Sequence, residues 1–334
     1  MQRRTRAVRI LATLALTAAM GVMGCKKGNE SASSSTTNPS ASGKKLTVGF
    51  SQIGAEGGWR TAETTSVISE GKNRGVDLKF SDAQQKQENQ IKALRSFVAQ
   101  NVDAIILAPV VETGWEPVLR EVKQAKIPVI LVDRGVKVDD ESLYTTLIAS
   151  DFVQEGRMAA EWLAKKTNGK CNIVQLQGTP GAAPAIDREK GFMEVIAKHP
   201  DMKVIKSQTG DFTRAKGKEV MEAFLKGDTN HEINAVYAHN DDMALGAIQS
   251  IEAAGLKPGT DITVVSVDGI KPAFEAIVAG KMNCTVECNP LLGPAAFDAA
   301  QKAVAGETIP KKTIVKDDLF DQANAKEAIG GRKY

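Results

Sequence analysis

The feature that most constrains the fold of this chain is a regular alternation of short apolar runs with longer amphipathic stretches, from Leu46 almost to the end. The runs are rich in Val, Ile and Leu, which is typical of buried strands in a parallel sheet. The stretches between them have helical periodicity, so each repeat predicts one βα unit. The series pauses near Ser150 and then begins again. Two such series predict two similar lobes.

The predicted elements define an α/β fold with two Rossmann-like lobes, each built on a parallel sheet. In the first series we expect strands at 46–52, 76–81, 102–108 and 128–133, with helices at 58–74, 87–100 and 114–124. A short extended segment at 144–150 and a helix at 152–166 lead to the second series, with strands at 171–177, 204–209, 233–239 and 262–268 and helices at 183–198, 213–226, 242–254 and 272–279. The tail adds a strand at 283–288, a helix at 292–305 and a last strand at 312–316.

The tail is expected to complete the first lobe, so that the chain crosses between the lobes near Ser150, Glu287 and Lys316. A hinge of three segments suits closure around a ligand. The predicted boundaries are a signal peptide at 1–25, a linker at 26–44, an N-terminal lobe at 45–149 plus 289–315, and a C-terminal lobe at 150–288 plus 316–334.

The first 25 residues have the layout of an export signal. Four arginines precede an apolar stretch at 10–23, which is too short and too rich in Ala for a permanent membrane span. The residues before Cys25 resemble a bacterial lipobox, in which the cysteine becomes the lipidated first residue, although Met23 replaces the usual small residue there. The Ser-rich segment at 26–44 predicts a flexible tether behind such an anchor. An ordinary secretory signal and, more weakly, a twin-arginine signal are the alternatives.

The net charge excludes one class of partner. The chain has 43 Lys and Arg residues against 40 Asp and Glu residues, and four of the arginines lie in the predicted signal. Cleavage would leave 39 basic residues against 40 acidic ones. A nearly neutral mature protein has no basic field to attract nucleic acid.

The cysteines and histidines give no sign of a metal or redox centre. Cys171, Cys284 and Cys288 have no zinc-type or CxxC spacing, and the three histidines have no metal partner nearby in the sequence. We expect Cys171 in the core. Along a strand, Cys284 and Cys288 would lie about 13 Å apart, which is too far for a disulfide without a bend, so their redox state is left open. No metal or other cofactor is predicted.

Polar side chains follow several predicted strands at their carboxyl ends. Asp133 and Arg134 follow the fourth strand of the first series, and Asn240 and Asp268 follow two strands of the second. Open parallel sheets bind ligands just beyond these ends. Carboxylates accept hydrogen bonds from hydroxyls, a guanidinium donates in a planar fork, and an amide does both. The sequence therefore predicts a cleft for a small, highly hydroxylated molecule. The plainer alternatives are a salt-bridged strand end, a helix cap and an ordinary turn.

Six segments resemble the periplasmic galactofuranose-binding proteins of bacterial ABC sugar transporters: 50–60, 82–93, 108–119, 210–214, 237–243 and 266–269. More distantly, the chain resembles the ribose-binding group of type I periplasmic proteins, which implies the two-lobe fold with three crossings. The strand-end residues are shared by many pentose and hexose binders. The run from Glu56 to Arg60 and the run from Trp115 to Pro117 are more particular to the galactofuranose type.

The resemblance implies a site of nine ligand-binding residues: Glu56, Trp59, Arg60, Asp133 and Arg134 from the first lobe, and Arg188, Phe212, Asn240 and Asp268 from the second. The two aromatic side chains would stack on the apolar C–H face of a sugar, and the others would hydrogen-bond its hydroxyls. The plainer alternatives are core aromatics, a solvated helix face for Arg188 and a helix-start charge for Glu56. Glu287 or Cys288 would occupy the place of a pocket glutamine in ribose binders, and the choice between them is left open.

The implied function is that of an exported substrate-binding protein. It would capture a monosaccharide, galactofuranose or galactose, by hinge closure and deliver it to an ABC permease and its ATPase. We expect a monomer in the periplasm or cell envelope, held at the membrane by a lipid anchor. The alternatives are a sugar-sensing protein for a membrane receptor and a binder of another sugar such as ribose.

Two other classes fit the sequence less well. A glycosidase would need two carboxylates across one bond, and Asp133 and Asp268 could face each other in this way. We expect the neighbouring arginines to lower both pKa values, which would disable a general acid. A sugar-responsive repressor shares the two-lobe core but would begin with a basic helix-turn-helix in place of an export signal. We therefore expect a binding protein and no enzyme.

Overall fold

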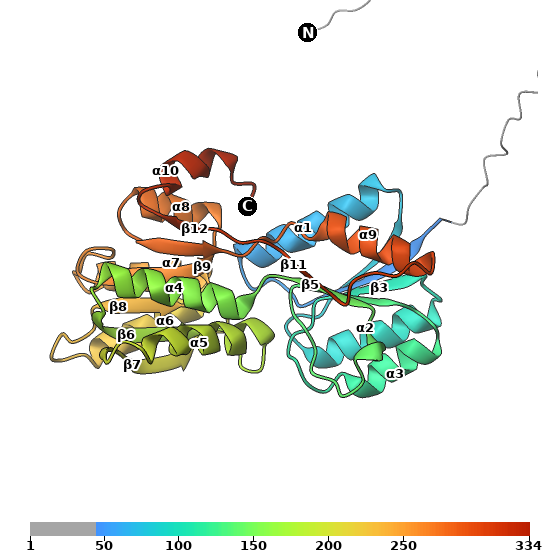
Figure 1. The fold of residues 1–334 in the computed structure, drawn as a ribbon, viewed down its shortest axis with the longest axis horizontal. Helices are drawn as coiled ribbons and strands as arrows, with labels where there is room; N and C mark the ends of the chain where they lie inside the picture. Colours follow the sequence, from blue (N-terminus) through green and yellow to red (C-terminus); the bar gives the residue numbers. More distant parts are fainter. Residues whose placement is uncertain (1–44) are drawn as a thin grey trace, which may run out of the picture. The chain divides into compact units, whose positions relative to one another are not determined.

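The computed structural model of the protein describes residues 45–334. The predicted signal peptide, the linker and Cys25 lie outside the described residues. The described chain is built on two six-stranded sheets, each with helices on its faces (Figure 1). None of the helices in residues 45–334 combines the length and apolarity that a membrane span requires.

The first sheet is parallel throughout, in the order β11-β5-β4-β3-β1-β2. Its strands are β1 (Thr47–Gln52), β2 (Asp77–Asp82), β3 (Ala104–Leu107), β4 (Val129–Val132), β5 (Thr146–Ala149) and β11 (Lys312–Ile314). Its helices are α1 (Gly58–Asn73), α2 (Gln87–Ala99), α3 (Glu116–Gln124) and α9 (Gly293–Val304), with a short 3-10 turn at Glu141–Leu143. One core cluster joins the strands to α1 and α9, and another joins them to α2 and α3. Both faces of β3 and β4 are therefore buried.

The second sheet has the order β12-β10-β9-β8-β6-β7, and only β12 runs antiparallel to its neighbour. Its strands are β6 (Lys170–Gln177), β7 (Asp201–Thr209), β8 (Ala235–Ala238), β9 (Thr263–Asp268), β10 (Cys284–Glu287) and β12 (Leu319–Asp321). Its helices are α4 (Phe152–Lys166), α5 (Ala183–Ile196), α6 (Arg214–Lys226), α7 (Asp241–Ala253), α8 (Lys271–Val278) and α10 (Ala325–Ala328), followed by a 3-10 turn at Ile329–Gly331. A single core cluster unites these elements.

Within residues 45–334, the chain passes from one sheet to the other between β5 and α4, between β10 and α9, and between β11 and β12 (Figure 1). Side chains connect these passages. The Ser150 hydroxyl donates to Asp317 at 3.0 Å, and the Cys288 sulfur lies 3.6 Å from the same hydroxyl. The three passages are therefore in contact with one another through Ser150.

The structure confirms the predicted α/β fold class with two parallel-sheet lobes. One prediction about the tail is wrong, because β11 is followed by a further strand, β12, and by α10. β12 has three half-buried residues, of which only Leu319 and Phe320 are apolar, and this is too short for a strand signal in the sequence. It forms by antiparallel pairing with the edge of β10, which is a tertiary contact.

Candidate functional site

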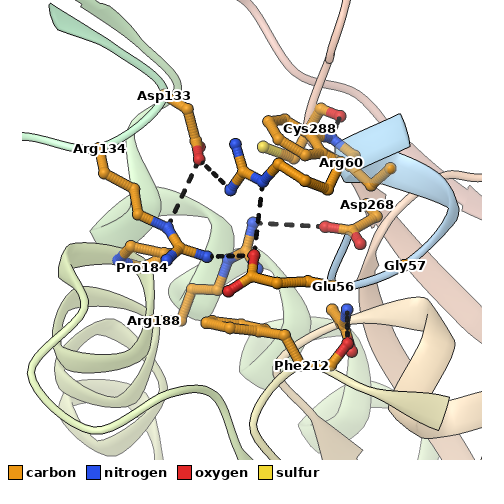
Figure 2. Close-up of a pocket in the computed structure, with 12 residues that line it drawn as sticks. Glu56, Gly57, Arg60, Asp133, Arg134, Pro184, Arg188, Phe212, Asp268 and Cys288 are labelled. Atoms are coloured by element: carbon orange, nitrogen blue, oxygen red, sulfur yellow. Dashed lines mark hydrogen bonds and ion pairs between the residues drawn. The ribbon is translucent and has the colours of Figure 1, made fainter. Parts of the chain in front are cut away.

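A cavity lies at the carboxyl ends of strands from both sheets (Figure 2). Its lining contains all nine residues that the sequence singled out: Glu56, Trp59, Arg60, Asp133, Arg134, Arg188, Phe212, Asn240 and Asp268. The lining also contains Gly57, Pro184 and Cys288. The glycine and the proline were not foreseen, because neither has a polar group that marks it as a binding residue.

The contribution of the first lobe is a chain of buried charges of alternating sign. The loop after β1 supplies Glu56, the first turn of α1 supplies Arg60, and the end of β4 supplies Asp133 and Arg134. Arg60 Nη2 lies 2.6 Å from Asp133 Oδ2, and Arg134 Nη2 lies 2.7 Å from Glu56 Oε2. All four side chains are at most 5% exposed, so water does little to screen these pairs. Each acid is paired and can still accept from further donors.

A carboxylate outside the cavity supports this network. Glu63, one turn along α1, contacts the Arg60 guanidinium and accepts from Gln52 Nε2 at 3.0 Å. Burial raises the pKa of Glu63 to about 7, even with Arg60 beside it. Burial alone would lower the pKa of Arg60, but Glu63 and Asp133 outweigh it and raise that pKa. Arg60 is therefore held as a cation between several acids.

The second lobe presents a matching donor. Arg188, on α5, donates to Glu155 Oε2 at 2.7 Å and to the His239 carbonyl at 2.5 Å. Its Nη2 lies 3.6 Å from Asp268 Oδ1 (Figure 2). The Arg188 residue is only 3% exposed, which excludes the alternative of a solvated helix face.

The expected direction of one pKa shift is wrong. We expected arginines to lower the pKa of both strand-end aspartates, but burial raises the pKa of Asp268 well above its usual value, although Arg188 opposes this. The reason is that Asp268 is 3% exposed and its nearest guanidinium nitrogen lies at 3.6 Å, so desolvation exceeds the attraction. A lowered pKa of Asp268 therefore cannot be used to argue against an enzyme.

The two aromatic residues line the cavity from opposite lobes. The Trp59 indole donates to the Cys288 carbonyl at 2.5 Å, which fixes the ring against the second passage between the sheets. Phe212 lies in the loop before α6, and its ring is 5.1 Å from the Arg134 guanidinium carbon of the other lobe. A Cβ on Gly178 would lie only 1.9 Å from the Phe212 ring, so the ring depends on the absence of a side chain there.

Asn240 combines two roles. Its side-chain oxygen accepts from the Met243 amide at 3.0 Å and caps α7, while its amide nitrogen donates to the Phe212 carbonyl at 3.0 Å. Asp133, Phe212 and Asp268 have positive φ angles of 59°, 59° and 129°. Such conformations are uncommon for residues with side chains and cluster at functional sites.

Of Glu287 and Cys288, only Cys288 is among the residues that line the cavity. Glu287 instead accepts from Arg332 at 2.6 Å and from the Tyr334 hydroxyl at 2.9 Å.

Cys171, Cys284 and Cys288 are all buried and unpaired. Within residues 45–334, no group of three acidic, histidine or cysteine side chains is placed to hold a metal ion. The cavity thus offers hydrogen-bonding charges and two aromatic faces, which suits a small polar molecule.

Comparisons with known proteins agree with this geometry. Residues 48–308 match the family described as periplasmic binding protein domain. The chain is 54% identical over 306 residues to the galactofuranose-binding protein of Escherichia coli, covering 91% of this chain and 96% of that one. The crystal structure of a galactofuranose binding protein superposes with a TM-score of 0.84 at 54% identity, covering 86% and 98% of the two chains. The binding protein of the arabinose ABC transporter from Shewanella, bound to L-arabinofuranose, superposes with a TM-score of 0.84 at 58% identity, covering 86% and 96%.

Proposed function

We propose that this chain, which belongs to the periplasmic binding protein domain family, is the substrate-binding protein of an ABC transporter and captures a monosaccharide by closure of its two lobes. The observation that carries the proposal is the lining of one buried cavity by alternating acids and arginines from both sheets. Such a lining cannot form on one lobe alone. We propose no catalytic reaction for it.

In the proposed mechanism the paired acids and arginines keep their contacts with one another and add hydrogen bonds to the sugar. Asp133 accepts hydrogen bonds from neighbouring hydroxyls, and Arg134 donates to hydroxyl or ring oxygens. Arg188, Asn240 and Asp268 add hydrogen bonds from the second lobe when it closes. Closure also removes water, which strengthens every charged hydrogen bond inside. Sugar drives closure because it binds the closed form more tightly than the open form.

Galactofuranose, or galactose, is the proposed ligand. Two observations support this choice: the similar proteins of solved structure bind furanose sugars, and the run from Glu56 to Arg60 lies on the cavity wall. In this assignment Trp59 and Phe212 stack on apolar C–H groups of the sugar, each from its own lobe. The alternative is a binder of another sugar, such as ribose. A titration with several sugars distinguishes the two assignments.

Cell location and lobe boundaries complete the proposal. A periplasmic binding protein acts outside the cytoplasm, and we propose a monomer whose Cys25 is lipidated and anchors it through the linker at 26–44. We propose the lobes at 45–149 plus 289–315 and at 150–288 plus 316–334. Intact-mass analysis of membrane-extracted protein tests the anchor, since an unmodified N-terminus contradicts it.

Uptake by living cells tests the transport role. A strain that lacks this protein should lose high-affinity uptake of the labelled sugar, and the wild-type gene should restore it. The Arg134→Ala gene should not. If uptake persists and only a sugar-induced signalling response is lost, the protein is a sensor and the transport proposal is wrong.

A further inference from the structure

Helix α1 carries Trp59 and Arg60 into the cavity, yet it begins without a capping side chain of its own. Its N-cap is Gly57, which has no side chain to accept from the first amides. The first turn of any helix leaves backbone N–H groups without partners inside the helix. An acceptor for α1 must therefore come from elsewhere.

That acceptor comes from the other lobe. Asp242, in the first turn of α7, accepts from the Gly58 amide at 2.7 Å through Oδ2. Its other oxygen, Oδ1, accepts from Arg214 at 2.7 Å and 3.0 Å. The Asp242 side chain is only 6% exposed, whereas Arg214 is 44% exposed. The carboxylate therefore lies between the lobes: Oδ2 accepts from the first lobe, and Oδ1 accepts from Arg214 of the second lobe.

The contact with Asp242 leaves no room for a side chain at position 57. A Cβ at position 57 would lie 2.1 Å from Asp242 Oδ2 and 2.8 Å from its Cγ. The φ of Gly57 is −175°, which any residue can adopt, so the backbone conformation does not demand glycine here. Glycine is needed at position 57 because the carboxylate of the opposite lobe approaches so closely.

We propose that Asp242 is a positioning residue that caps α1 across the cleft, so that closure of the lobes fixes the helix turn that carries Trp59 and Arg60. The contact can exist only when the lobes meet, because Gly58 belongs to the first lobe and Asp242 to the second. Opening leaves the α1 amides uncapped and Asp242 paired with Arg214 alone. The cap therefore favours the closed form without touching sugar. This inference rests on the proposed function, since it concerns the closure that holds the sugar.

The test compares variants of the full chain by stopped-flow tryptophan fluorescence with methyl β-D-galactofuranoside and D-galactose as probes. Asp242→Ala should raise Kd about tenfold, mainly through faster release, because the cap forms after the sugar has docked. Gly57→Ala should act in the same direction by displacing the carboxylate. In the Asp242→Ala background, Gly57→Ala should add little, since both changes remove the same contact. Asp140→Ala is the matched control, because Asp140 caps the 3-10 turn at 141–143 within one lobe, and Kd should not change.

Amide hydrogen exchange separates this role from a general loss of stability. With saturating sugar, the amides of residues 58–60 should be protected in the wild type and should exchange faster in Asp242→Ala, while the core strands stay protected. Wild-type Kd in folded Asp242→Ala and Gly57→Ala would overturn the inference alone. If Asp242→Ala does not fold, the Kd of Gly57→Ala alone decides, and a wild-type value overturns the inference. If the wild type binds neither these probes nor any other sugar, the proposed function fails and the inference fails with it.

Discussion

Asp133 and Arg134 are neighbours in the sequence, but each pairs more closely with the segment around the start of α1 than with the other. Asp133 Oδ2 lies 2.6 Å from Arg60 Nη2 and 3.5 Å from Arg134 Nε. Arg134 Nη2 in turn lies 2.7 Å from Glu56 Oε2. The strand end and the helix start therefore form one rigid wall of the cavity, which is pre-organised before a ligand arrives.

Arg134→Ala should weaken sugar binding by at least about tenfold. The change removes a buried donor and leaves Glu56 without its closest cation, which is costly in a buried site. Isothermal titration measures the effect. Arg95→Ala is the matched control, since Arg95 pairs with Glu121 on the exposed surface, and affinity should not change. Equal affinity of Arg134→Ala and the wild type would remove Arg134 from the site.

Gly178→Ala should also weaken binding, although residue 178 does not line the cavity. The new methyl group would overlap the Phe212 ring, and overpacking of this kind costs about 1–3 kcal/mol. We expect the ring to move and the affinity to fall about tenfold or more. Gly227→Ala is the control, because the nearest atom to its Cβ would be the flexible end of Lys206, at 3.2 Å, and the backbone oxygens of Ala223 and Phe224 would lie at ordinary contact distances of 3.5 Å and 3.7 Å. An unchanged Kd for Gly178→Ala would show that the position of Phe212 does not matter.

The stability of the hinge should depend on pH through Asp317. Burial, followed by repulsion from Glu155, raises the pKa of Asp317 to about 8. The folded protein thus holds this proton more tightly than the unfolded chain. The contribution of Asp317 to the free energy of unfolding is therefore complete below a pH of about 4 and is lost as the pH rises toward 8. Asp317→Asn mimics the protonated acid. Urea unfolding should give the variant the same stability as the wild type at about pH 4 and a higher stability at about pH 9. Parallel pH profiles would contradict this.

The thiols of residues 45–334 should be inert in the native protein. Burial raises the pKa of Cys171, Cys284 and Cys288, which lowers the fraction of reactive thiolate. A Cys25→Ser variant treated with Ellman's reagent should show no fast reaction when folded and three reactive thiols when denatured. Fewer than three thiols in the denatured, non-reduced protein would reveal a disulfide that the structure does not contain.

Local sequence signals were enough for most of the fold. Helix α4 begins and ends at the predicted residues because Asp151 caps it and apolar residues recur at helical spacing. Strands β3 and β4 are continuous apolar runs with both faces buried. Strand β12 was missed because its existence depends on pairing with β10, which no local pattern records.

The cavity shows a similar division. The convergence of polar residues at strand ends follows from the geometry of parallel sheets, so it could be predicted before the structure was known. The partners of these polar residues could not be predicted, because Arg60 approaches Asp133 only once folding brings the start of α1 to the end of β4. The raised pKa of Asp268 depends on burial between two lobes, which is a property of the assembled cavity. The binding role of the nine residues stays a prediction.

The most direct test of the central claim is isothermal titration of the protein with methyl β-D-galactofuranoside, D-galactose, D-ribose and L-arabinose. The account predicts tight binding, at one site per chain, of the galactofuranoside or of galactose, and weaker binding of both by Arg134→Ala. Binding restricted to the pentoses would contradict the ligand assignment, and no binding of any of the four would contradict the proposed role of the cavity.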